Sequence, residues 1–251
     1  MYIGATVISL KNLDIKKLEY IILPGSPAVG FRHLNLHNRV YLYWREFWKQ
    51  VYGSAEGVDG DFFMRQNFVP VVMYGDEIVA MHLYTLFNPR AMVTKDHTYF
   101  HSYPPEFFDY LAQQNIDSVM SIESLTVNPE WRKSKIGLSL GETMIGCSLK
   151  FVEVLNVGAA IAPTRNDRGV NKMCYNFNFD CYKANLNYRG FEVDLVCGIR
   201  EKVTSNPDSR INDLINWLWQ SRTDLSGVIS INRNLNNSQE GKYGEPKGIA
   251  V

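Results

Sequence analysis

A basic segment that contains glycine offers the clearest chemistry in this sequence. It is "NPEWRKSKIGLSLGETM", residues 128–144, in which Arg132, Lys133 and Lys135 come shortly before Gly137 and Gly141. The apolar run just before it is typical of a strand. Three interpretations fit such a pattern: a serine nucleophile inside "GLSLG", a phosphate cradle, or a helix that merely begins with basic residues.

The serine hydrolase pattern G-x-S-x-G is matched at Ser139, but its surroundings do not suit a nucleophile. An elbow of that kind needs a strand that runs directly into the serine, whereas this strand is expected to end near Val127. The α/β-hydrolase order also needs a histidine after the serine, and all five histidines precede it. We therefore expect Ser139 to be a small residue on a helix.

Phosphate binding depends on backbone amides and positive charge. The sequence contains neither G-x-x-x-x-G-K-[ST] nor G-x-G-x-x-G, so a P-loop and a dinucleotide fold have no fingerprint here. A helix start nevertheless offers unpaired N–H groups and the positive end of the dipole, and glycine admits an anion close to the backbone. The segment predicts an anion site, and a solvated basic helix start is the alternative that these residues leave open.

The elements that would position this segment follow from hydrophobic periodicity. A strand is predicted for "SVMSIESLTV", followed by a helix from about Arg132 to Val154. Two strands around a tight turn are predicted for "FVPVVMYGDEIVAMHLYTLF". Downstream we expect a strand in "VGAAIAP", a short helix in "GVNKMCYNFNF", one or two strands in "CYKANLNYRGFEVDLVCGI" and a helix in "RINDLINWLWQSR".

Two regions are candidates for the walls of a ligand pocket. Aromatic and apolar residues recur at helical spacing over residues 38–52, although a core-facing helix is the simpler explanation. Residues 88–118 interrupt the strands with "HTYFHSYPPEFFDYLAQQ", and so long an excursion is typical of a lid or binding surface.

One domain is expected over residues 1–231, with irregular structure in residues 1–30. Residues 232–251 are rich in Asn, Ser, Gly and Lys, and we expect a flexible tail there.

Composition limits the classes of partner. The 251 residues carry no net charge, which gives no indication of nucleic acid or of an acidic membrane surface. The four cysteines form no C-x-x-C pair, so we expect no metal site. There is no signal-peptide pattern and no apolar run long enough to span a membrane, and we expect a cytoplasmic protein.

The stretch "IESLTVNPEWRKSKIGLSLGETM" resembles the acetyl-CoA-binding motif of the GCN5-related N-acetyltransferase (GNAT) superfamily. That motif combines an apolar strand, a valine and a turn with R/Q-x-x-G-x-G/A. Arg132 takes its first position and Gly137 its last, whereas Lys135 replaces the middle glycine. A lysine there could crowd the pyrophosphate or add charge to it. The resemblance covers roughly residues 68–200, and the usual Asn…Tyr…Gly-Phe spacing downstream is not kept.

The resemblance implies an α+β (mixed α/β) fold, in which helices flank a mostly antiparallel central sheet whose strands splay to admit the pantetheine arm. Main-chain groups of Leu125 and Val127 would bind the pantetheine amides. The cofactor's pyrophosphate would lie on a run of residues that begins at the motif arginine, and two asparagines downstream would also reach the cofactor. These residues are Arg132, Lys133, Ser134, Lys135, Ile136, Gly137, Leu138, Asn166 and Asn171.

The resemblance also implies direct transfer in a ternary complex, with an amine attacking the thioester. Glu123, on the motif strand, is the candidate base, and an ion pair is its structural alternative. Tyr175, on the helix after the next strand, is the candidate acid, and a packed aromatic is its alternative. No metal would take part.

The function implied is N-acyl transfer from acetyl-CoA or another acyl-CoA to a small-molecule or amino-acid-like amine, and a homodimer is a further expectation. One alternative is a long-chain N-acyl amino acid or acyl-homoserine-lactone-type synthase that uses acyl carrier protein. Another is a degenerate binding module without catalysis. Fold analogy alone does not decide among them.

Overall fold

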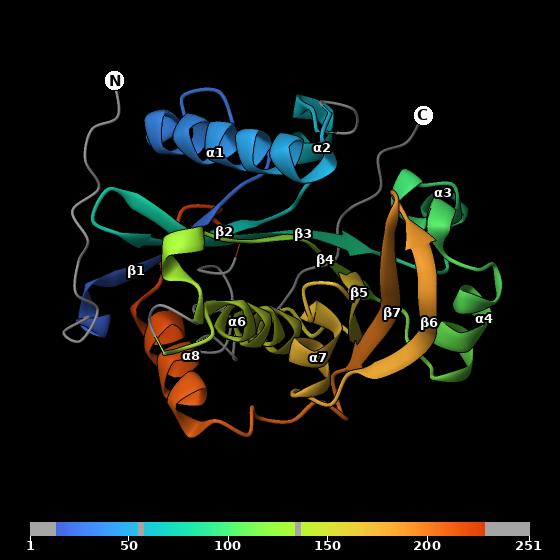
Figure 1. The fold of residues 1–251 in the computed structure, drawn as a ribbon. Helices are drawn as coiled ribbons and strands as arrows, with labels where there is room; N and C mark the ends of the chain where they lie inside the picture. The colour runs from blue at the N-terminus through green and yellow to red at the C-terminus, as the bar shows by residue number, and fades with distance from the viewer. Residues whose placement is uncertain (1–13, 55–57, 134–136, 229–251) are drawn as a thin grey trace, which may run out of the picture.

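The described part of the chain is built on one eight-stranded sheet with the order β6-β7-β5-β4-β3-β2-β1-β8. The computed structural model describes residues 14–54, 58–133 and 137–228 (Figure 1). Neighbouring strands are antiparallel except for the parallel pairs β4–β5 and β1–β8. The mixed, mostly antiparallel sheet with flanking helices that the resemblance implied is therefore confirmed.

The central strands are rich in valine, isoleucine and methionine, and most of their residues are buried. Such near-continuous apolar runs are typical of strands that are covered on both faces. The strands are β1 (Leu18–Leu23), β2 (Val69–Tyr74), β3 (Glu77–Phe87), β4 (Val119–Val127), β5 (Ala159–Arg165), β6 (Asp180–Tyr188), β7 (Phe191–Ile199) and β8 (Thr223–Asp224).

Helices cover both faces of the sheet. In Figure 1, α1 and α2 lie on one face, and α6, α7 and α8 lie on the other. The described helices are η2 (Ile15–Lys17), α1 (Leu34–Tyr52), α2 (Gly60–Met64), α3 (Met92–Lys95), η3 (Thr98–Ser102), α4 (Glu106–Gln113), η4 (Pro129–Trp131), α6 (Leu140–Val154), α7 (Val170–Tyr175) and α8 (Ser209–Ser221).

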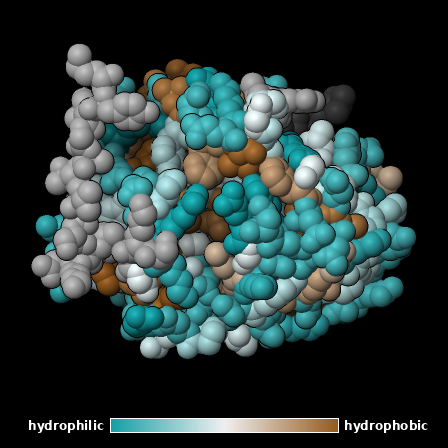
Figure 2. Space-filling view, viewed as in Figure 1, coloured by the Kyte–Doolittle hydropathy of each residue, from teal (hydrophilic) through white to brown (hydrophobic). Residues whose placement is uncertain are grey.

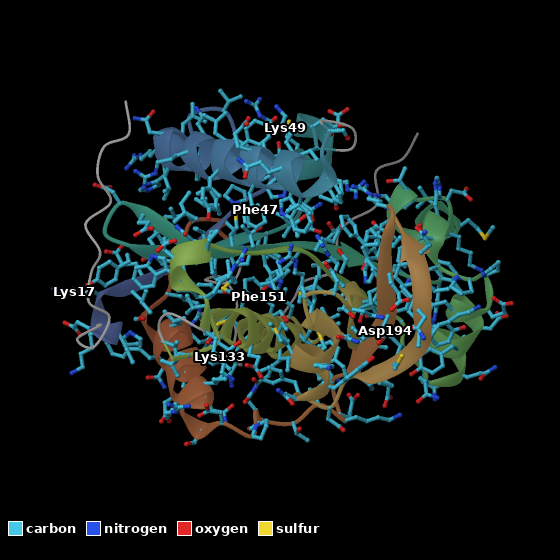
Figure 3. The ribbon with its side chains drawn as sticks, viewed as in Figure 1. Lys17, Phe47, Lys49, Lys133, Phe151 and Asp194 are labelled. Atoms are coloured by element: carbon cyan, nitrogen blue, oxygen red, sulfur yellow. The ribbon has the colours of Figure 1, made fainter. Side chains whose placement is uncertain are left out.

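Each helical layer buries its own apolar cluster against the sheet. On one face α1 buries Val40, Trp44 and Trp48 against β2 and β3. On the other face α6 and α8 pack together over the sheet, and Phe151 lies between α6 and the strands (Figure 3). The same figure shows Phe47 on the sheet-facing side of α1 and Lys49 on its outer side, as an amphipathic helix requires.

The excursion over residues 88–118 forms α3, η3 and α4. Its aromatic side chains Tyr99, Phe100 and Phe107 are buried in a third cluster, against β4, β5 and β7. This segment is therefore a packed layer in the structure, and its role as a lid stays a prediction.

Two sequence-based boundaries are wrong. Residues 1–30 were expected to be irregular, yet "LEYIIL" forms β1, which pairs with β2 along its whole length. The helix expected from about Arg132 begins at Leu140, because Ser139 caps it and Gly137 has a φ of 73°. The expected tail at residues 232–251 lies outside the described residues.

Candidate active site

The parallel strands β4 and β5 separate after a short region of pairing. Their register runs only from Val119↔Ala159 to Ser121↔Ile161, although β4 continues to Val127 and β5 to Arg165. Beyond Ser121, β4 and β5 are no longer paired with each other. The splayed central strands implied by the resemblance are therefore present.

A β-bulge in β4 marks the splay. Ser124 has a φ of 56°, and the β3–β4 register shifts between Met81 and Leu83 at the same level. One extra residue in a strand bends it and changes which face the following side chains point to. The Glu123 side chain accordingly lies on the α2 side of the sheet. The side chains of Leu125 and Val127 pack against the apolar cluster beneath α6, on the other side.

Helix α1 holds the bulge in place. The indole Nε1 of Trp48 donates to Thr126 Oγ1 at 2.9 Å, and that hydroxyl donates to the Ser124 carbonyl, also at 2.9 Å. Both bonds are at least partly buried, so their loss would leave polar groups unsatisfied. The kink in β4 is thus fixed from the helical layer that faces it.

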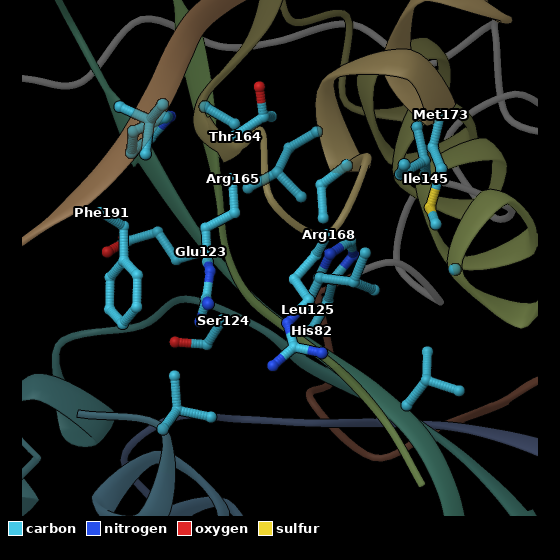
Figure 4. A pocket seen from close by; sticks show the side chains of 18 of the residues that line it. His82, Glu123, Ser124, Leu125, Ile145, Thr164, Arg165, Arg168, Met173 and Phe191 are labelled. Carbon is cyan, nitrogen blue, oxygen red and sulfur yellow. The ribbon is translucent and has the colours of Figure 1, made fainter. Parts of the chain in front are cut away.

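A cavity of about 550 Å³ occupies the splay. Residues of α1 and α2 line it from one face of the sheet, and residues of α6 and α7 line it from the other. Figure 4 shows Glu123 and Phe191 on one side of this space and Ile145 and Met173 across it. In Figure 2 the surface is hollowed between α1 and α6, and hydrophobic side chains are visible inside the hollow. The cavity is therefore lined by elements from both faces of the sheet.

The α6 side of the cavity is formed by a capped helix start. Ser139 Oγ accepts from the Glu142 amide at 3.2 Å, and Ser139, Leu140 and Gly141 line the cavity. The 15-residue helix directs its positive dipole end at this wall. A Cβ on Gly141 would lie 2.9 Å from the Met173 sulfur, so the glycine lets the Met173 side chain of α7 pack closely against the start of α6. Ser139 is a helix cap, and this role accounts for a serine at that position without a nucleophilic function.

The predicted donor-binding residues divide into three groups. Leu125, Val127, Arg132 and Lys133 line the cavity. Gly137 and Leu138 are not among the described lining residues, although the Gly137 amide donates to the Lys133 carbonyl at 2.9 Å. The predictions for Ser134, Lys135 and Ile136 lie outside the described residues.

Glu123 is a buried carboxylate that opens onto the cavity. Ser121 Oγ donates to Oε1 at 2.9 Å, and Arg65 Nη2 lies 3.5 Å from Oε2. Burial raises the pKa of Glu123, while the Arg65 charge and the Ser121 hydrogen bond lower it less strongly. A carboxyl group with a raised pKa is the better proton acceptor once it is ionised.

The turn between β6 and β7 reaches the mouth of the cavity, which the sequence reasoning missed. Arg189 and Gly190 have φ values of 51° and 80°, and Tyr188 pairs with Phe191 across them. Two successive positive φ values are the signature of a type I′ hairpin turn. The turn brings Tyr188, Arg189 and Phe191 against the end of α1, where the Phe191 and Tyr52 rings lie 6.0 Å apart.

Tyr175, the predicted acid, is hydrogen-bonded to Asp194. The cavity is lined by Val170, Met173 and Cys174 of α7, which share one face of the helix, and Tyr175 is not among the described lining residues. Its hydroxyl donates to Asp194 Oδ2 at 2.5 Å, and burial together with this bond raises the pKa of Tyr175. Cys174 lines the cavity, whereas Tyr175, the next residue along the helix, is not among the described lining residues.

Asn166 and Asn171 also bind Asp194, at 3.0 and 2.9 Å. Burial opposes ionisation of Asp194, but the hydrogen bonds from Asn171 and Tyr175 outweigh it and lower its pKa to about 2. Neither asparagine is among the described residues that line the cavity. The structure therefore brings both to Asp194, and their predicted contact with the cofactor stays a prediction.

His82 is a further lining residue that the sequence reasoning missed. Burial lowers its pKa to about 3, so its imidazole is neutral at physiological pH. Its Nδ1 lies 3.2 Å from the Tyr84 hydroxyl. The sequence feature that could have indicated this residue is a histidine inside the apolar run "IVAMHLY".

Other kinds of site are not seen in the part of the chain that the structure describes. No group of three or more His, Cys, Asp or Glu residues there could hold a metal ion. None of the helices in the described ranges is long and apolar enough to cross a membrane.

No protein family model and no curated protein matches this sequence. Solved structures do match it. The CoA-dependent acyl-homoserine lactone synthase BjaI is 9% identical, with a TM-score of 0.49, over 85% of this chain and 99% of its own. FeeM, an N-acyl amino acid synthase from uncultured soil microbes, is 7% identical, with a TM-score of 0.44, over 73% and 92%. Arabidopsis thaliana NAA60, solved with acetyl-CoA, is 10% identical, with a TM-score of 0.45, over 72% and 98%.

Likenesses at these identities and TM-scores carry no argument about activity. The fold rests on this chain's own strand order, on the separation of β4 from β5 and on the bulge at Ser124. These features agree with the mixed, mostly antiparallel sheet with splayed central strands that the motif implied.

Proposed function

We propose that this protein is an N-acyltransferase that moves an acetyl or other acyl group from acyl-CoA to an amine in a ternary complex. One observation carries the proposal. One cavity lies where β4 and β5 separate; Arg132, Lys133 and the N-terminus of α6 line it on one side, and a buried carboxylate, Glu123, lines it on the other.

The α6 side suits an anionic donor with a long apolar arm. Over the cavity as a whole, five basic and two acidic side chains are among the described lining residues, although the chain has no net charge. Arg132 and Lys133 line the same cavity as the α6 N-terminus, a combination that favours a pyrophosphate. Leu125, Ile145 and Met173 offer apolar contacts for a pantetheine arm. When bound, acyl-CoA supplies an activated carbonyl carbon and a thiolate leaving group.

In this proposal Glu123 receives the proton of the attacking amine. The amine nitrogen forms the C–N bond as the C–S bond breaks, and the proton passes from nitrogen to the carboxylate. A main-chain N–H near Leu125 is the proposed donor to the developing oxyanion, because the bulge turns the backbone there. The thiolate then takes a proton from an acid or from solvent.

The identity of the acid is open to direct test. Tyr175 remains the acid predicted from the sequence, and its hydroxyl is bonded to Asp194. Tyr188 lines the cavity, and burial raises its pKa to about 12. Turnover of Tyr175→Phe and Tyr188→Phe variants, measured side by side at saturating donor, decides between these two residues.

The donor is tested by thermal-shift measurements and mass spectrometry with acetyl-CoA, a long-chain acyl-CoA and free CoA. Stabilisation by any of them supports a CoA site, and N-acylated product from a mixture of amines supports transfer. An intact protein that none of the three stabilises contradicts the proposal. Binding without turnover favours the non-catalytic module.

A long-chain donor is the second candidate, and the α1 wall favours it. Phe47, Trp48 and Val51 line the cavity beside the place expected for the thioester, and this apolar surface suits a fatty acyl chain. Stabilisation by long-chain acyl-CoA alone, or transfer only from an acyl carrier protein thioester, favours this candidate over acetyl transfer.

A further inference from the structure

The excursion over residues 88–118 reaches the proposed base through one chain of polar contacts. Thr98 Oγ1 accepts a hydrogen bond from Arg65 Nη1 at 2.8 Å, and Arg65 Nη2 lies 3.5 Å from Glu123 Oε2. Thr98 lies in η3, Arg65 follows α2 directly and Glu123 lies in β4. One arginine thus connects three elements that are distant in sequence.

Thr98 is exposed, but the residues on either side of it are anchored. The ring of His97 packs against that of Phe87, with 4.9 Å between the centroids, and His97 Nδ1 accepts from the Tyr99 amide at 3.2 Å. Tyr99 is buried, and its hydroxyl donates to the Ile161 carbonyl at 3.1 Å, where β5 separates from β4. Thr98 therefore presents its hydroxyl from a backbone that is held on both sides.

The Arg65 side chain also stacks on the Phe62 ring. Its guanidinium carbon lies 4.2 Å from the ring centroid, a contact that allows the planar group to turn on the ring. Arg65 Nε is buried and has no hydrogen-bond partner in the part of the chain that the structure describes. Because water would satisfy this nitrogen, an Arg65 released from Thr98 should move outward, away from Glu123.

We infer that Thr98 is a positioning residue, which holds Arg65 against the base Glu123. The inference rests on the proposed N-acyl transfer and gives the excursion a role in fixing the base of that reaction. Burial raises the pKa of Glu123 and the Arg65 charge opposes this, by an attraction that weakens as the two groups separate. Loss of the Thr98 hydroxyl should therefore raise the pKa of Glu123 further.

Other ionisable groups act on Glu123 from the elements around it. They are Arg189, Tyr52, Tyr99, Tyr103 and Tyr188. Burial raises the pKa of all four tyrosines, so they stay neutral in the acid range, in which Arg189 stays charged. Burial and nearby positive charge lower the pKa of His97, which therefore titrates on the acid side as well. A test has to follow the Glu123 carboxyl itself.

Infrared difference spectroscopy across a pH series does so without any ligand. The spectrum of each full-length protein is compared with that of the same protein carrying Glu123→Gln. In Thr98→Val the ratio of ionised to protonated carboxyl at a fixed pH should fall about two- to tenfold, as the loss of one hydrogen bond would give. Arg65→Met should shift the titration in the same direction, and the double variant should match Arg65→Met. An unchanged titration in Thr98→Val, or additive shifts in the double variant, overturns the inference.

Two further variants assign the effect to the Thr98 hydroxyl. Thr98→Ser keeps the acceptor oxygen and should titrate like the wild type. Thr204→Val removes the hydroxyl of another exposed threonine, in the segment after β7, and is the matched control that should leave the titration in place. A Thr98→Ser titration displaced as far as that of Thr98→Val overturns the inference.

Failure of this inference differs from failure of the reaction. If Glu123 is the base, the acid limb of acetyl transfer from acetyl-CoA should move with the carboxyl titration in Thr98→Val. Acetyl transfer by the wild type, with an unmoved titration in Thr98→Val, overturns the inference and leaves the proposed function standing. A moved titration, without transfer by the wild type from acetyl-CoA or a long-chain acyl-CoA, contradicts the proposed function instead.

Discussion

Glu123 is held between two opposing influences. Burial disfavours its ionised form, whereas Arg65 and Ser121 support it. If it is the base, Glu123→Gln should reduce turnover by roughly 10²–10⁴-fold, because the amide cannot accept the proton. Binding of acyl-CoA should be unchanged. Glu153→Gln, an exposed glutamate of α6 that pairs with Lys150, is the matched control. Turnover is measured by thiol release.

The pH dependence of turnover follows from the same carboxyl group. Because the pKa of Glu123 is raised, turnover should fall on the acid side at a pH above the usual glutamate range. Arg65→Met removes a charge that lowers this pKa, so the acid limb should move to higher pH. The measurement is kcat/KM against pH for both proteins. An acid limb that stays in place contradicts the assignment of this limb to Glu123.

Ionisation of Glu123 should also show in stability. Its pKa is higher in the folded chain than in the unfolded chain, so the folded chain binds the proton more tightly. Wild-type stability is therefore expected to decline as pH rises from the unfolded pKa to the folded pKa. Glu123→Gln should not show this decline, because its amide does not ionise. The difference between its unfolding midpoint and that of the wild type should therefore increase as pH rises from the unfolded pKa to the folded pKa. A constant difference in midpoint contradicts the raised pKa.

The resemblance of the motif strand was enough to point to Glu123, Leu125 and Val127, which all line the cavity. Simple alternation would have put the three side chains on one face, and the bulge at Ser124 that separates Glu123 from the other two could not be predicted from the pattern. The residues that sequence reasoning missed come from elsewhere. Arg189 reaches the cavity only because a hairpin tip folds back against α1, and local pattern carries no information on such a contact. Tyr175 was placed in the correct short helix, but its hydrogen bond to Asp194 of β7 depends on how α7 packs, which a local pattern does not show.

At the scale of the element, the start of α6 is fixed by Ser139. Its hydroxyl accepts from the Glu142 amide, in the S-x-x-E pattern of a capping box. Ser139→Ala should lower the free energy of unfolding by about 0.5–2 kcal/mol, the usual range for losing such a cap. Ser139→Asn keeps a capping oxygen and should restore most of the loss. Denaturant titration measures both, and equal stability of all three proteins contradicts the capping role.

Most elements could be predicted because their apolar periodicity was long and clear, as in α1, β3 and α8. The error at Arg132 has a physical cause. Basic and polar residues suit a helix surface, so composition favoured an early start, whereas the Ser139 cap and the positive φ of Gly137 fix the actual one. The strand β1 was missed because a six-residue apolar run is too short for its period to be decisive.

Across the whole molecule, the net charge does not show how charged residues are distributed between the cavity and the rest of the chain. The chain has equal numbers of acidic and basic residues, yet among the charged residues that line the cavity in the described part of the chain the basic ones outnumber the acidic ones. A net charge of zero therefore does not exclude a highly anionic ligand. Donor binding should weaken as salt rises from low to physiological concentration, since exposed charges are screened. Calorimetry across a salt series checks this, and salt-independent binding contradicts an electrostatic donor site.

The central claim is that one cavity binds an acyl-CoA on its basic side and performs transfer at Glu123 on the other. It is tested most directly by measuring acyl-CoA affinity and saturated turnover together for wild type, Arg132→Ala and Glu123→Gln. We predict that Arg132→Ala binds about tenfold more weakly but still turns over, whereas Glu123→Gln binds like wild type and loses turnover. Absence of acyl-CoA binding in the wild type, or full turnover in Glu123→Gln, would contradict the account.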